Sequence, residues 1–262
     1  IGNSSHSQST STGSGARILS LNTGSKWFRI AASILLIALT SLLTVMLINR
    51  SEPVLLGSAG TAVEVLELSD GTTVTLRPNS AIYELALSED EHLYRLEGEA
   101  LFSVTDNAAR EFTVRAGRGE VTVLGTRFNL FRRNDRTRVD LLEGSVRFAN
   151  IETLESVTLQ AGEAAEISDT LSLSAPFKAE VDNITGWTQN RLTFRSRPLD
   201  DILSELEFHF GIRIQAPATV REEFLGGSIM LDNRDQALRD LGTVLGGRFV
   251  ETESDKYEFV YN

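Results

Sequence analysis

The longest apolar stretch of the chain is Ile30–Ile48, nineteen residues without a charge, a proline or a glycine. As a helix with a rise of ~1.5 Å per residue it would extend over roughly 28 Å, close to the ~30 Å hydrocarbon core of a bilayer. A helix pairs its own backbone polar groups, which lipid cannot do. The few polar residues of the run, such as Thr40, can bond to carbonyls of the preceding turn. The pattern predicts a transmembrane helix over residues 27–49.

Charge around this run sets its expected orientation. Arg17, Lys26 and Arg29 precede it and no acidic residue does, whereas the acidic excess of the chain follows it. By the positive-inside rule, the N-terminus is cytoplasmic and the rest is periplasmic. A cleaved signal peptide is the alternative, but the run is long for one and no small-x-small cleavage site follows promptly. Residues 1–26, rich in Ser, Thr and Gly, are expected to be a flexible cytoplasmic linker. Because residue 1 is not Met, we expect the sequence to begin within a longer protein.

Residues 54–172 alternate between apolar and polar positions, as in Phe112-Thr113-Val114. Turn signals separate the alternating stretches, among them Ser69-Asp70-Gly71 and Pro78-Asn79-Ser80. The pattern predicts about ten strands at a spacing of roughly 8–12 residues. It indicates an all-β domain and leaves a sandwich, a barrel and an irregular solenoid open.

The last part of the chain has a mixed pattern. Residues 173–186 read as a linker, and residues 187–262 predict the order βαββαββ, a small α+β domain. Pro198 is suited to the first position of a helix that Gly211 ends. The apolar stripe of that helix is Leu199, Ile202, Leu203, Leu206 and Phe210. A second helix is expected to begin at Asn233 or Asp235, and a hairpin closes the chain.

Composition excludes several classes of function. A net charge of −11 does not suit nucleic-acid binding, and the absence of Cys removes thiol chemistry and Cys-type zinc sites. The three His residues show no ligand spacing, so we expect no metal and no cofactor. His209 is expected to be solvated or half-buried. Glu97 and Glu99 would share one strand face, where a solvated position is favoured over a pair of glycosidase carboxylates.

Six segments of the β region belong together: residues 68–76, 96–104, 112–114, 123–130, 142–146 and 159–163. In their order and spacing they resemble the FecR family of envelope regulators. The tail from Trp187 is similar to the C-terminal module of the family, which resembles the short N-terminal domain of secretins and TonB-dependent transducers. The resemblance implies an anti-sigma factor, a single-pass inner-membrane regulator of an extracytoplasmic-function sigma factor, as in iron or nutrient uptake.

The resemblance also implies the partners. The C-terminal module would bind the periplasmic signalling domain of a TonB-dependent receptor, by strand addition. Residues expected at that contact are Leu192, Phe194, Leu199, Leu203, Ile212, Ile214 and Ile229. Family members usually carry a helical sigma-binding domain before the membrane span, whereas only the linker is found here. Either that domain lies in a segment before residue 1, or this chain does not itself hold the sigma factor.

Gly125-Thr126 is the one position with implied chemistry, because some family members are reported to cleave themselves at a matching Gly-Thr pair. Asn129 or Arg127 would stabilise the oxyanion. No activating base is evident, so a structural glycine is the favoured interpretation. The competing function for the whole chain is a membrane-anchored periplasmic binder of glycan or peptidoglycan. Such a binder would need an aromatic-lined platform, which the 7% aromatic content of the chain does not favour. The sequence has no G-x-S-x-G motif that would indicate a hydrolase.

Overall fold

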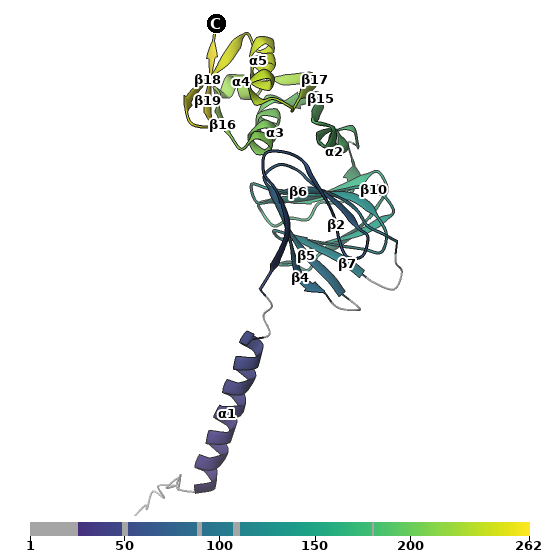
Figure 1. The fold of residues 1–262 in the computed structure, drawn as a ribbon, viewed down its shortest axis with the longest axis vertical. Helices are drawn as coiled ribbons and strands as arrows, with labels where there is room; N and C mark the ends of the chain where they lie inside the picture. The colour runs from purple at the N-terminus through teal and green to yellow at the C-terminus, as the bar shows by residue number, and fades with distance from the viewer. Residues whose placement is uncertain (1–25, 49–51, 88–90, 107–110, 180) are drawn as a thin grey trace, which may run out of the picture. The chain divides into compact units, whose positions relative to one another are not determined.

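The computed structural model describes residues 26–48, 52–87, 91–106, 111–179 and 181–262 (Figure 1). For residues 26–29, 42–48, 87, 91 and 181–183 the description covers the backbone alone. The chain divides into two units, residues 1–51 and 52–262. The predicted linker over residues 1–26 lies, except for its last residue, outside the described residues.

The first unit contains the helix α1 (Lys26–Ile48). Thr40 Oγ1 donates to Ile37 O at 3.0 Å, as the sequence led us to expect. The described side chains of α1, residues 30–41, are all exposed, including Leu35 at 72%. Among the described residues, no helix has both the length and the apolar character needed to span a membrane.

Residues 54–178 form two seven-stranded sheets that pack face to face as a β-sandwich. The first sheet has the order β1-β4-β5-β7-β8-β11-β12, and the second has the order β14-β13-β10-β9-β6-β3-β2. The strands are β1 (Val54–Ala59), β2 (Glu64–Glu67), β3 (Thr73–Leu76), β4 (Ser80–Leu87), β5 (Glu91–Glu97), β6 (Glu99–Ser103), β7 (Glu111–Ala116), β8 (Gly119–Val123), β9 (Arg127–Arg133), β10 (Arg136–Glu143), β11 (Ser145–Asn150), β12 (Ser156–Gln160), β13 (Glu163–Ile167) and β14 (Phe177–Lys178).

The chain passes repeatedly from one sheet to the other. β5 and β7 are parallel neighbours in the first sheet, while β6, which lies between them in sequence, belongs to the second. The described part of residues 54–172 holds thirteen strands rather than the expected number of about ten. The sequence left a sandwich, a barrel and an irregular solenoid open, and the structure is a sandwich.

The interior of the sandwich is apolar. In several strands alternate residues face inward, as in β7, where Phe112 and Val114 are buried and Glu111 and Arg115 are exposed. Phe102 and Phe128, from neighbouring strands, stack with their ring centroids 4.9 Å apart, and neither is accessible to solvent. The period-two pattern that predicted the strands therefore also supplies the core.

Residues 187–262 follow the predicted βαββαββ order, with a 3-10 turn and the short helix α4 in addition, and α2 precedes them. Two small sheets form, β15-β17 and β16-β19-β18, and α3 and α5 pack with them over a common apolar core. The elements of this C-terminal module are α2 (Val181–Gly186), a 3-10 turn η1 (Trp187–Gln189), β15 (Arg191–Pro198), α3 (Leu199–Phe210), β16 (Arg213–Gln215), α4 (Ala218–Arg221), β17 (Phe224–Met230), α5 (Arg234–Val244), β18 (Gly247–Glu253) and β19 (Lys256–Tyr261).

Helix ends of this module follow the sequence signals. Gly211 ends α3 in the left-handed conformation, at a φ of 68°, and the side chain of Asn233 accepts from Gln236 N at the start of α5. Pro198 is the N-cap of α3 rather than its first residue. The segment predicted as a linker, residues 173–186, carries β14 and α2.

Candidate functional site at the junction of the sandwich and the C-terminal module

A cluster of buried charged side chains joins the sandwich to α3 of the C-terminal module. Arg77 follows β3, Glu99 begins β6, and Arg133 ends β9, so the three lie at one end of the second sheet. Glu205 comes from the middle of α3, and Arg197 from the end of β15. Arg77 and Glu99 are 1% and 3% exposed, and Glu205 is 9% exposed. We call these five residues the junction cluster.

Glu99 is the acceptor on the sandwich side. Its Oε2 accepts from Arg77 Nη1 at 2.8 Å and from Arg133 Nη2 at 2.6 Å, and its Oε1 accepts from Asn129 Nδ2 at 3.0 Å. The preceding Gly98 has a φ of +90°, and a Cβ there would lie 2.3 Å from Ser80 Oγ. Only glycine fits this turn, which allows the Ser80 hydroxyl to accept from Glu99 N at 2.9 Å. The Gly98 turn therefore fixes the start of β6 and its carboxylate.

Glu205 is the acceptor on the module side. Its Oε2 accepts from Arg77 Nη1 at 2.7 Å and lies 3.1 Å from Arg133 Nη1. Its Oε1 lies 3.4 Å from Arg197 Nη2. Arg77 thus bridges the two carboxylates, one from each part of the chain. Charges taken out of water are costly unless they are paired, so docking of α3 completes the pairing of Arg77 and Arg133.

The electrostatics of the cluster favour the charged forms. Burial raises the pKa of Glu205, but Arg133, Arg77 and Arg197 lower it more, and the net result is a pKa well below the usual range. Burial lowers the pKa of Arg77, yet Glu99 and Glu205 together raise it above its ordinary value. Arg77 and Glu205 are therefore both charged throughout the physiological pH range.

Polar contacts at the end of α3 extend the junction. Asn79, in the turn between β3 and β4, donates from Nδ2 to Phe208 O at 2.8 Å and to His209 O at 3.3 Å. A residue of the sandwich thus pairs the last carbonyls of a helix of the module. His209 is 3% exposed and donates from Nε2 to Leu231 O at 3.3 Å, so the expectation of a solvated or half-buried His209 is wrong. Burial and the charge of Arg77 lower its pKa to about 4.

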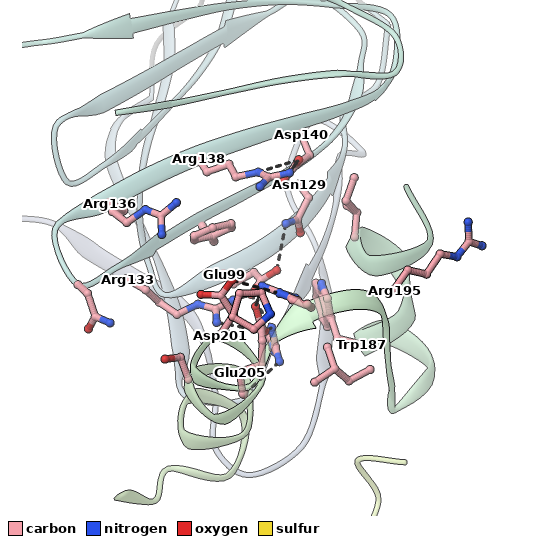
Figure 2. A pocket seen from close by; sticks show the side chains of 18 of the residues that line it. Glu99, Asn129, Arg133, Arg136, Arg138, Asp140, Trp187, Arg195, Asp201 and Glu205 are labelled. Carbon is pink, nitrogen blue, oxygen red and sulfur yellow. Dashed lines mark hydrogen bonds and ion pairs between the residues drawn. The ribbon is translucent and has the colours of Figure 1, made fainter. Parts of the chain in front are cut away.

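A cavity of about 390 Å³ opens beside the junction cluster (Figure 2). Its walls come from β9 and β10 of the sandwich and from η1, β15 and α3 of the module. In this view Arg136 lies on one side of Glu99, and Trp187 and Arg195 lie on the other. Within the described residues, no group of three or more His, Asp and Glu side chains could hold a metal ion.

The structure places the residues expected at the receptor contact inside the module. All of them are at most 6% exposed and belong to its apolar core: Leu192, Phe194, Leu199, Leu203, Ile212, Ile214 and Ile229. Side chains in this position hold α3 against the two small sheets and do not present themselves to a partner. Phe224 and Met230, at the two ends of β17, are among the exposed apolar side chains of the module, with exposures of 64% and 52%.

Gly125 and Thr126 lie between β8 and β9, and the Thr126 side chain is turned inward. Thr126 is 6% exposed, and its Oγ1 donates to Ser145 O at 3.1 Å. A Cβ on Gly125 would lie 2.6 Å from Asp106 Cα, so close packing alone requires glycine here. The same position would lie 2.8 Å from Asp106 Oδ1, which brings a carboxylate to the Gly-Thr pair. Nothing in the sequence pattern indicated this neighbour.

Two expectations about polar residues need correction. Asn129 is 1% exposed and donates to Glu99, so it belongs to the junction and is not available to the Gly-Thr pair. Arg127, in contrast, lines the same surface pocket as Gly125 and Thr126. Glu97 is exposed but Glu99 is buried, so the pair does not form a solvated strand face. A glycine between two acidic residues was the only signal for Glu99.

Comparisons with known proteins agree with this fold. Residues 58–147 match the family model described as FecR protein. Two crystal structures of candidate anti-sigma factors from Parabacteroides distasonis are similar to the chain, each with a TM-score of 0.67. They are 21% and 22% identical to it, over 80% and 79% of this chain and 100% and 99% of theirs. At this identity the likeness shows the fold. No curated protein matches the sequence.

Proposed function

We propose that this chain is a regulator of the anti-sigma type, which relays an envelope signal to an extracytoplasmic-function sigma factor, because residues 58–147 match the FecR family model. The family match carries the proposal. The likeness to candidate anti-sigma factors, in both the sandwich and the module, agrees with it. The junction cluster supplies a route, since a partner that moves α3 would disturb the pairing of Glu99 in the sandwich.

An inner-membrane anchor with a cytoplasmic N-terminus is part of this proposal. It is supported by the uncharged run of residues 30–48, by the basic residues before it, and by the exposure of the described α1 side chains. The chain has no Cys, so single cysteines report topology cleanly. In intact cells, a maleimide that crosses the outer membrane but not the inner membrane should label Ser254→Cys and should not label Ser14→Cys. The reverse pattern, or extraction of the protein by carbonate, would rule out this topology.

The upstream partner in this proposal is the periplasmic signalling domain of a TonB-dependent transducer. It would add a strand to the module, most simply along β17, where Phe224 and Met230 are exposed. Affinity purification from solubilised membranes, followed by mass spectrometry, should recover a TonB-dependent transducer and a sigma factor. Phe224→Asp should reduce recovery of the transducer, and Val244→Asp, on the surface of α5, should not. Recovery of cell-wall glycan and of neither protein would favour the anchored binder instead.

Self-cleavage at Gly125-Thr126 is a second activity that one observation favours, the proximity of Asp106. Thr126 Oγ would attack the Gly125 carbonyl carbon, with its proton passing through the carboxylate to the departing Thr126 nitrogen. Water would then hydrolyse the ester, giving a Gly125 carboxylate and regenerating the Thr126 hydroxyl. Immunoblotting should show two fragments for the native chain, one intact band for Thr126→Ala, and slower cleavage for Asp106→Asn. Fragments that persist in Thr126→Ala would exclude this chemistry.

A further inference from the structure

The cavity beside the junction cluster has an excess of positive charge. Six arginines line it, against four acidic side chains. The arginines are Arg77, Arg133, Arg136, Arg138, Arg195 and Arg197. They come from both parts of the chain, since four belong to the sandwich and two to β15 of the module. A concave site of this charge, with a volume in the range of small-molecule pockets, is suited to an anionic ligand.

Buried donors on the cavity wall point to the same chemistry. Trp187 is 2% exposed, and among the described residues nothing accepts a hydrogen bond from its Nε1. The same holds within the described part of the chain for the Nε atoms of Arg77 and Arg133. Buried polar groups are usually paired, and an unpaired donor costs about 1–3 kcal/mol. Three such donors on residues that line one cavity are best explained by a ligand that accepts hydrogen bonds.

The outer arginines are held weakly enough to turn toward a ligand. Arg136 pairs with Glu166 at 2.7 Å, but its side chain is 51% exposed. Arg197 lies 3.4 Å from Glu205 and 3.7 Å from Asp201, both long for an ion pair. An exposed pair such as that of Arg136 contributes little, so its exchange for ligand oxygens costs little, and Glu205 keeps Arg77 and Arg133 as closer partners if Arg197 turns away. The planar guanidinium group binds carboxylate and phosphate oxygens with two parallel hydrogen bonds.

We infer that this cavity is a binding site for a small molecule that carries carboxylate or phosphate groups. The oxyanion would lie between Arg133 and Arg136 of the sandwich and Arg197 of the module. The carbon part of the ligand would rest on Phe131 and Pro198, which also line the cavity. Such a ligand touches both parts of the chain and therefore stabilises their docked arrangement. The inference does not depend on the proposed relay, because the cavity is a property of the fold.

Isothermal titration of the full chain in detergent tests this site, with pyrophosphate and succinate as probes and sodium chloride at matched ionic strength as the reference. We expect at least one probe to bind with one site per chain and to raise the melting temperature. Tighter binding of pyrophosphate assigns a phosphate ligand, and tighter binding of succinate a carboxylate. The double variant Arg136→Gln/Arg197→Gln should weaken binding at least tenfold, whereas Arg147→Gln, on the exposed face of β11, should not.

If the double variant does not fold, Arg136→Gln alone serves, because it breaks only a half-exposed pair. It should weaken binding several-fold while leaving the circular dichroism spectrum unchanged. The inference is overturned if neither probe binds beyond the salt reference. It is equally overturned if Arg136→Gln and Arg147→Gln weaken binding to the same extent, since the charge of the surface as a whole would then account for the signal.

Discussion

The interior of the sandwich and its junction with the C-terminal module are both buried, but they are held by different forces. The sandwich interior is built from apolar side chains such as Phe102 and Phe128, whose burial is favourable in many arrangements. The junction is built from charges such as Arg77 and Glu205, which tolerate burial only while each keeps its partners. One chain therefore combines an apolar body with a charged joint that is stable only while its charges are paired.

The largest effect is expected in the sandwich interior. Phe102→Ala removes a ring that stacks on Phe128 and is inaccessible to solvent, and the cavity left behind should lower the free energy of unfolding by about 3–5 kcal/mol. Denaturant unfolding of the full chain measures this loss. Phe224→Ala, at a residue that is 64% exposed, is the matched control and should change it by less than about 0.5 kcal/mol. Equal losses in the two variants would contradict the assignment of the core.

Glu205→Gln should produce the next largest effect, and at the junction alone. It leaves Arg77 and Arg133 sharing one carboxylate, and breaking a buried pair costs about 3–5 kcal/mol. We expect the lower end of that range, because Glu99 remains. Hydrogen exchange should then accelerate in α3 while β7 and β8 stay protected. Glu258→Gln, exposed on β19, is the control and should leave both unchanged. Uniform acceleration across the sandwich would contradict a separable joint.

Acid should weaken the junction through His209. Its folded pKa of about 4 lies below the unfolded value of about 6.5, because burial and Arg77 disfavour the imidazolium. The unfolded state therefore binds a proton first, and stability should fall as the pH drops from about 6.5 to about 4, by roughly 3 kcal/mol in full. Comparing native and His209→Gln chains over this interval isolates the effect, since Glu205 and Glu99 are common to both. Parallel curves would show that His209 does not contribute.

The smallest effect is expected at Asn79. Asn79→Gly keeps a residue that accepts the φ of 62° but removes the donor to the end of α3, which should cost about 1 kcal/mol. Asn134→Gly is a close control, because Asn134 has a φ of 47° and lies in the turn between β9 and β10. Thermal unfolding of both variants compares them. If Asn134→Gly lowers the melting temperature as much as Asn79→Gly, the hydrogen bonds of Asn79 add nothing.

Local signals were sufficient to predict much of the fold. The alternation in residues 54–172 identified strands because inward positions in a sandwich recur every second residue, and Gly211 and Asn233 marked helix ends. The pattern could not decide between a sandwich and a solenoid. That choice depends on which strands pair, and pairs such as β5 with β7 join segments separated by a strand of the other sheet.

The junction could not be predicted in the same way. Arg77 and Glu205 are 128 positions apart, and each by itself has the sequence context of a surface residue. Their burial follows from docking of two parts of the chain, which leaves no local period. The apolar stripe of α3 was identified correctly, but the sequence did not distinguish a core from a contact surface, as the burial of Leu199 and Leu203 shows.

The alternation of strands between the two sheets has a consequence for a broken chain. A break between β8 and β9 would leave each fragment with strands in both sheets. The fragments would still be joined by the ladder of β8 with β11 and by that of β6 with β9. The two fragments of a cleaved sandwich would therefore remain associated as a noncovalent complex. Separating them would require breaking these ladders, with a cost in free energy comparable to unfolding the domain, so cleavage alone would not release either fragment.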